Sequence, residues 1–133
     1  MMKKLKTMLL VVAMLSMFSV TAFATSYGSS ATMLVAAGGG WQSDHSIKDT
    51  KAYADVKTGK INVSKETMWT TPKGRIVNSD DDTRSSSVNL PDAGTFSVTL
   101  YSSCKKGYNY YLSVKPSAYQ NGTDNITARI NVG

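Results

Sequence analysis

The clearest pattern in the sequence is the strict alternation of apolar and polar residues near the C-terminus. Three segments show it: 95–102, 108–115 and 125–132. Successive side chains of a β-strand point to opposite faces of a sheet, so a period of two predicts strands with one buried face. In the first segment the apolar set is Phe96, Val98 and Leu100. We therefore predict three strands here, each facing a hydrophobic core.

Upstream, short apolar runs and turn residues continue at the same spacing in a weaker form. Further short strands are expected at 32–37, 50–57, 61–64, 68–71, 75–78 and 86–90. Glycine and proline residues separate these runs, and both favour turns. About seven to nine short strands in one domain predict an all-β fold, a small antiparallel β-sandwich of the immunoglobulin-like or jelly-roll-like kind. The alternative is a small β-barrel.

Two of the alternating segments also suggest how strands pair. If 95–102 and 108–115 form a hairpin, both apolar sets must lie on one face of it. This condition places Val98 opposite Leu112 and leaves 103–107 as the loop, a length that hairpins allow. The sequence therefore predicts a hairpin in this register.

Aromatic residues provide the candidate ligand-binding positions. In the predicted register Tyr101 and Tyr111 are diagonal neighbours on the outer face, and Arg129 extends that face if the last strand joins the sheet. Trp41 follows three glycines and Trp69 precedes a proline turn, so loops can present both indoles. Aromatic faces beside hydroxyl and amide groups suit sugar stacking. The alternative interpretation is a cross-strand pair that only stabilises the sheet.

The N-terminal segment has the pattern of a secretory signal peptide. Lysines at positions 3, 4 and 6 precede an apolar run over 8–20, and the small residues Ala22 and Ala24 follow. We expect cleavage after Ala24, which separates a signal peptide at 1–24 from a single domain at 25–133. The apolar run is shorter than the ~20 residues of a spanning helix, so no transmembrane segment is expected after cleavage. The short, lysine-led signal resembles those of Gram-positive bacteria, and a secreted, extracellular location follows.

Composition excludes several functions. The chain of 133 residues has a net charge of +6, but the signal peptide carries three of its fifteen basic residues and none of its nine acidic ones. The remaining charge of +3 is too small to indicate nucleic-acid binding. One histidine and one cysteine do not supply a zinc site. Ser43, Asp44 and His45 are too close in sequence to converge as a hydrolytic triad. We expect no enzymatic activity.

Two further groups are candidate sites for a metal and for thiol chemistry. Asp80, Asp81 and Asp82 concentrate oxygen ligands in one loop, which suggests a weak calcium site or a solvated acidic turn. No other cofactor is expected. Cys104 has no partner cysteine, so it is expected to be an exposed reactive thiol or the link of a disulfide-bonded homodimer, and the alternative is an inert thiol. The adjacent lysines should favour its thiolate.

These features together predict a secreted, bacterial, non-catalytic β-sandwich that acts through a surface. Its expected partner is an extracellular glycan or a protein, because a small secreted all-β domain without an evident active site has few other roles. The alternative is a small antimicrobial or toxin-like protein that acts on a competitor's cell envelope.

Overall fold

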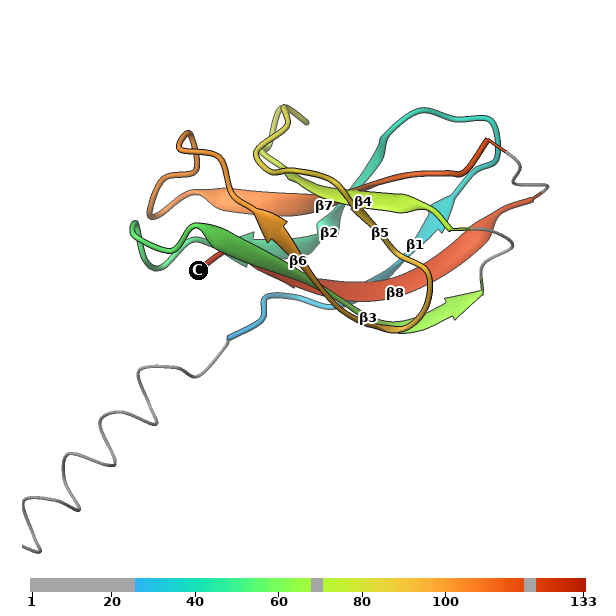
Figure 1. Cartoon of the computed structure of the whole chain (residues 1–133), viewed down its shortest axis with the longest axis horizontal. Helices are drawn as coiled ribbons and strands as arrows, with labels where there is room; N and C mark the ends of the chain where they lie inside the picture. The colour runs from blue at the N-terminus through green and yellow to red at the C-terminus, as the bar shows by residue number, and fades with distance from the viewer. Residues whose placement is uncertain (1–25, 68–70, 119–121) are drawn as a thin grey trace, which may run out of the picture.

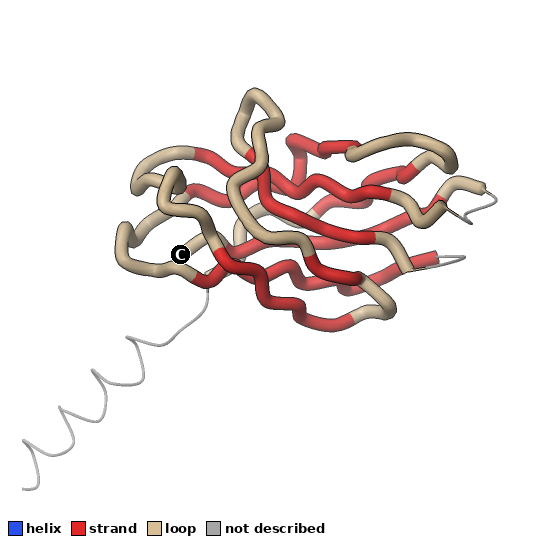
Figure 2. Tube along the Cα trace, turned by 45° about the horizontal axis from the view of Figure 1, so that its top comes forward, coloured by secondary structure: helices blue, strands red, loops and turns tan. Residues whose placement is uncertain are grey.

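Two four-stranded antiparallel sheets stack face to face in the computed structural model, which describes residues 26–67, 71–118 and 122–133 (Figure 1). The strands are β1 (Ala31–Val35), β2 (Gln42–Thr50), β3 (Thr58–Thr67), β4 (Lys73–Val77), β5 (Val88–Asn89), β6 (Gly94–Thr99), β7 (Asn109–Lys115) and β8 (Asp124–Asn131). Strands and loops make up all of the described part of the chain, as Figure 2 shows. Accordingly, these ranges include no helix that is long and apolar enough to cross a membrane.

The order of the strands defines the type of sandwich. One sheet has the order β1-β8-β3-β6 and the other the order β2-β7-β4-β5, and both remain open rather than closing into a barrel. Each sheet therefore interleaves early and late strands of the chain, which is the arrangement of an eight-stranded jelly roll. The predicted all-β sandwich is confirmed, and its jelly-roll-like form is the one observed.

Apolar residues from both sheets meet in a single core. Its fully buried members include Ile61 and Val63 of β3, Ile76 of β4, Leu112 and Val114 of β7, and Ile126, Ala128 and Ile130 of β8. Complete burial of a Val, Leu or Ile side chain contributes about 1.5–3 kcal/mol to stability. The alternation predicted for the three C-terminal segments is confirmed within β6, β7 and β8, because their alternate residues face this core, but Tyr108 at the start of 108–115 is 64% exposed.

The predicted hairpin between 95–102 and 108–115 is wrong. In the structure β6 pairs with β3, where Val98 lies opposite Gly59. Its supposed partner β7 lies in the other sheet, with Leu112 opposite Ile76 of β4. Both strands bury alternate residues, but they do so from opposite sides of the core. Alternation identifies the buried face of a strand and not the strand beside it.

The strand expected at 50–57 is also wrong. The chain forms β2 before this segment and an irregular connection within it, where Ala52 and Ala54 are exposed. β2 is almost entirely polar and only Ile47 is fully buried, so it has no apolar periodicity from which a strand could be predicted. The other weak candidates correspond to β1, β3, β4 and β5, whereas most of 68–71 lies outside the described residues.

Gly28 lies where the N-terminal segment connects the two sheets. Its N–H donates a 3.0 Å hydrogen bond to the Ile130 carbonyl of one sheet, and the next N–H, of Ser29, donates a 2.8 Å bond to the Lys48 carbonyl of the other. A Cβ atom added at Gly28 would lie 1.9 Å from the Lys48 carbonyl oxygen. Any larger residue therefore has to displace backbone.

We expect Gly28→Ala to lower the free energy of unfolding by about 1–3 kcal/mol, the usual cost of forcing an extra carbon into a packed site. Gly40→Ala is the matched control, because an added Cβ there meets nothing within 4 Å, and its effect should stay within about 0.5 kcal/mol. Urea unfolding of both variants measures the difference. Equal stability of the two would show that the Gly28 segment is not held between the sheets.

Candidate functional site

The outer face of the β2-β7-β4-β5 sheet carries the candidate site. Tyr111 and Ser113 of β7 point outward, because the residues that alternate with them are buried in the core. Ser113 lies opposite Arg75 of β4 on one side and opposite Ser43 of β2 on the other. One row across this face is therefore Ser43, Ser113 and Arg75.

Trp41 lies over this row. Its indole ring is 4.0 Å from the central carbon of the Arg75 guanidinium, a cation–π contact. The loop that carries Trp41 is closed at its base by two hydrogen bonds between Ala36 and Gln42, of 2.9 and 3.0 Å. The base of the loop is thus fixed to β2, and Trp41 stands next to it.

A second stacked pair lies beside the first. The His45 ring lies 4.1 Å from the Tyr111 ring with an angle of 19° between their planes. A bulge in β2, between Asp44 and Lys48, brings His45 over β7. Within the bulge the Ser46 N–H donates a 2.8 Å hydrogen bond to the Asp44 carboxylate. Because Tyr111 and Ser113 are two residues apart, the two stacked pairs are about 7 Å apart along the strand.

We call Trp41, Arg75, His45 and Tyr111 the stacking surface. Tyr111 is partly buried, whereas the His45 side chain is 49% exposed, so His45 is the outer ring of its pair. The four side chains are planar and come from three different parts of the chain. They present two planar groups side by side to the solvent.

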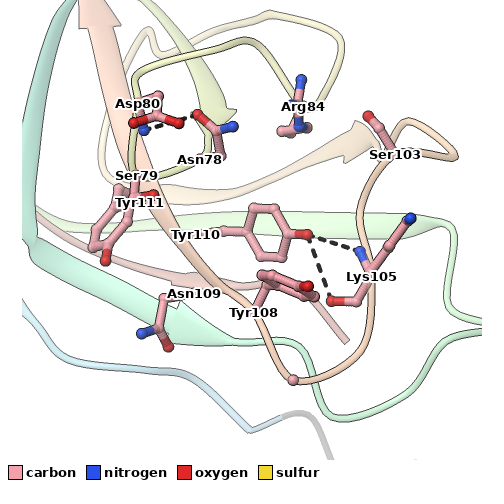
Figure 3. Close-up of a pocket in the computed structure, with 11 residues that line it drawn as sticks. Asn78, Ser79, Asp80, Arg84, Ser103, Lys105, Tyr108, Asn109, Tyr110 and Tyr111 are labelled. Carbon is pink, nitrogen blue, oxygen red and sulfur yellow. Dashed lines mark hydrogen bonds between the residues drawn. The ribbon is translucent and has the colours of Figure 1, made fainter.

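A polar cleft of about 490 Å³ adjoins the stacking surface at Tyr111 (Figure 3). It lies between the loop at 78–84 and the connection from β6 to β7. The residues that line it include three tyrosines and three charged groups, namely Tyr108, Tyr110, Tyr111, Asp80, Arg84 and Lys105. The Lys105 N–H donates a 2.7 Å hydrogen bond to the Tyr110 hydroxyl, which holds the connection against the sheet.

The carboxylates of Asp81 and Asp82 in the 78–84 loop have partners within the protein. Asp81 is 3.0 Å from His45 Nε2, and hydrogen bonds from His45 and Ser43 lower the pKa of its carboxyl group below the ordinary value of 3.8. Asp82 accepts a 3.4 Å bond from Asn78 and lies 3.9 Å from the Arg84 guanidinium. Within the described ranges, no three Asp, Glu, His or Cys side chains are grouped closely enough to hold a metal ion. The calcium site at Asp80, Asp81 and Asp82 stays a prediction.

The structure separates the residues predicted to bind a ligand. Trp41 and Tyr111 share the stacking surface, but Tyr101 lies in the β6–β7 connection, where it is near Arg75 and 46% exposed. The predicted diagonal pair of Tyr101 and Tyr111 is wrong, because β6 and β7 belong to opposite sheets. Trp69 lies outside the described residues.

Arg129 lies on the outer face of the other sheet, away from the stacking surface. Its guanidinium stacks over Tyr27 at 4.3 Å, and its Nε donates a 3.0 Å hydrogen bond to the Asn62 side chain. The predicted grouping of Arg129 with Tyr111 is therefore not observed. Arg129 belongs to a second surface, which also includes Tyr27 and Asn62.

Cys104 is a free thiol, but the expectation that it is exposed is wrong. Only 8% of its surface is accessible, and its Sγ donates a 3.2 Å hydrogen bond to the Arg84 carbonyl. Burial raises the pKa of the thiol, and the charges of Lys51 and Arg84 offset this effect only in part. The thiolate is disfavoured, so the reactivity expected from the adjacent lysines does not follow. The disulfide-linked homodimer stays a prediction, and forming it would require the β6–β7 connection to open.

Three residues of the site were not singled out by the sequence. Arg75 and Ser113 are ordinary outward positions of strands, and only the pairing of β4 with β7 brings them together. Nothing in the sequence around His45 indicates the bulge that places it over Tyr111. The one signal that the sequence offers here is the polar segment around Ile47, which forms β2.

Comparison of the chain with protein-family models, with curated proteins and with solved structures finds no match. The interpretation of the site therefore rests on its own geometry. That geometry combines two stacked pairs on a sheet face with a polar cleft beside them.

The contact between His45 and Asp81 gives a pH prediction. Because the pKa of Asp81 is lower in the folded protein than in the unfolded chain, its stabilising effect is present above pH 3.8 and is lost as the pH falls through the folded-state pKa. His45→Phe keeps a ring over Tyr111 but removes the donor. We expect the Asp81 pKa, measured by NMR titration of the carboxyl group, to rise toward 3.8 in this variant. An unchanged pKa would show that His45 does not hold Asp81.

Proposed function

We propose that the protein is a secreted, non-catalytic binding module that holds a glycan on its stacking surface. One observation carries this proposal: the Trp41–Arg75 and His45–Tyr111 pairs lie side by side on one sheet face and adjoin a polar cleft. The chain's single histidine stacks on Tyr111, so it is part of this surface.

A glycan suits this arrangement for physical reasons. The C–H face of a sugar ring is apolar and packs on an aromatic face, whereas its hydroxyl groups need hydrogen-bond partners. Aromatic side chains provide a flat apolar face, and a few placed polar groups fix the orientation of a ligand. The stacking surface supplies the first feature, and Asn78, Asp80 and Asn109 at the cleft supply the second.

A protein partner fits the surface less well. The centre of a protein–protein interface is usually apolar and depleted in charge. The large hydrophobic residues exposed in the described ranges lie in three separate segments, namely Leu34 of β1, Tyr53 of the β2–β3 connection, and Tyr101 and Tyr108 of the β6–β7 connection. They do not form a continuous apolar patch over the stacking surface.

Export can be tested directly. We expect the secreted form to begin at Thr25, because Ala22 and Ala24 satisfy the small-residue rule of signal peptidase. Intact-mass measurement of the protein in the culture supernatant of a Gram-positive host gives the mass of the chain. Membrane-bound protein that retains Met1 would contradict secretion and would indicate an anchor.

Binding is tested with three soluble oligosaccharides, one neutral (cellohexaose), one N-acetylated (chitohexaose) and one acidic (oligogalacturonate). Wild-type protein should bind at least one of them in isothermal titration calorimetry. Trp41→Ala should weaken that binding by about tenfold or more, equivalent to about 1.4 kcal/mol, as expected for an aromatic anchor. Trp41 lies in a loop, so its removal should leave the β-type circular dichroism unchanged.

Tyr53→Ala is the matched control, because Tyr53 is another exposed aromatic residue but lies outside the stacking surface. Its binding should equal that of the wild type. If Trp41→Ala binds normally and Arg129→Ala does not, the ligand occupies the outer face of the other sheet instead. If no oligosaccharide of the three classes binds, the glycan proposal is wrong.

A further inference from the structure

Two buried hydrogen-bonding atoms lie without a partner next to the stacking surface. They are Nε of Arg75 and Oγ of Ser113. Their residues are directly opposite each other on β4 and β7, and the Ser113 residue is only 1% exposed. Most buried polar atoms of native proteins are paired, so two adjacent exceptions require an explanation.

The charge of Arg75 is also uncompensated. The two ion pairs within the described ranges are His45–Asp81 and Arg84–Asp82, and neither includes Arg75. Burial lowers the pKa of the Arg75 guanidinium below its ordinary value, and nearby Tyr101 offsets this only in part. A partly buried cation without a counter-ion is costly, and an anion bound beside it would relieve that cost.

The unpaired Arg75 and Ser113 atoms indicate which chemical group would bind beside them. Nε of a guanidinium and one terminal nitrogen lie on the same edge, and their two N–H groups match the two oxygens of a carboxylate. Trp41 packs on the face of the guanidinium, so it does not use this edge. The Ser113 hydroxyl adds a third donor from the neighbouring strand.

Access to this edge requires a movement, since the Arg75 Nε is buried. The loop that carries Trp41 is suited to it. Gly38 has a φ of 72°, and a Cβ added at Gly38 or Gly40 would meet no atom within 4 Å, whereas one added at Gly39 would lie 2.6 Å from the Gln42 side chain at the base of the loop. The Ala36–Gln42 hydrogen bonds hold the base while the tip moves.

We propose that Arg75 and Ser113 form a subsite for the carboxylate of an acidic sugar, and that Trp41 is a movable cover which stacks on the same sugar. This inference rests on the proposed glycan function and names its ligand class. The carboxylate accepts hydrogen bonds from Arg75 and Ser113, while the indole shifts from the guanidinium toward the sugar ring.

The test compares oligogalacturonate with its fully methyl-esterified form, which has the same sugar ring without the charge. The chain has two tryptophans, so in a Trp69→Phe background the fluorescence reports Trp41 alone. The acid should change the Trp41 emission and bind about tenfold more tightly than the ester, as expected for hydrogen bonds to a charged group. Equal affinities for acid and ester would overturn the subsite.

Arg75→Gln should abolish the preference for the acid, and Arg75→Lys should keep only part of it, because lysine lacks the paired donors. The matched control is Arg129→Gln, which alters an arginine that also stacks on an aromatic ring but whose Nε already has a partner. It should keep the full preference. An unchanged preference in Arg75→Gln, or a loss in Arg129→Gln, would contradict the assignment.

Ser113→Ala covers the case in which Arg75→Gln does not fold. It should weaken binding of the acid several-fold and leave binding of the ester unchanged, whereas equal weakening of both would mean that Ser113 only supports the sheet. If the wild type binds neither galacturonate ligand but binds a neutral or N-acetylated one, the subsite is wrong and the glycan function stands. If it binds none of them, both proposals fail.

Discussion

The passage of the chain from β6 to β7 is the constraint on which the candidate site depends. These strands lie in opposite sheets, so the connection between them must cross the edge of the sandwich. It is held there by buried Leu100 and Cys104 and by the hydrogen bond from the Lys105 N–H to the Tyr110 hydroxyl. The Tyr101 N–H and the Cys104 Sγ donate hydrogen bonds to the Arg84 carbonyl, which join the crossing segment to the end of the 78–84 loop, and the polar cleft lies between the segment and the rest of that loop. The same crossing places β7 in the middle of its sheet, where Tyr111 becomes part of the stacking surface.

The two outer faces of the sandwich use the same contact in different ways. Each has an arginine stacked on an aromatic ring, Arg129 on Tyr27 and Arg75 on Trp41. The Arg129 Nε is satisfied by Asn62, which links β8 to β3 and stabilises the sheet. The Arg75 Nε has no such partner. This difference in hydrogen bonding is what marks one arginine as structural and the other as a candidate for recognition.

The sequence predicts a large part of the fold and a small part of the site. The strands at β6, β7 and β8 follow from alternation, since a half-buried strand requires it. The pairing of these strands does not follow from alternation. β6 and β7 would show the same alternation whether they lie in one sheet or in opposite sheets. β2 was missed because its single fully buried residue, Ile47, leaves no periodic pattern. Trp41 and Tyr111 could be predicted as exposed aromatic residues. The place of Arg75 in the site depends on the pairing of β4 with β7, which cannot be predicted from single residues.

The bulge of β2 has a consequence for the molecule in concentrated solution. β2 is an edge strand of its sheet, and a regular edge presents a row of free N–H and C=O groups that can pair with a second molecule. The irregular stretch between Asp44 and Lys48 breaks that row and adds charge to it. The distortion that brings His45 over Tyr111 therefore also opposes pairing between the β2 edges of two molecules. Straightening it would remove the second stacked pair and leave β2 with a more regular edge.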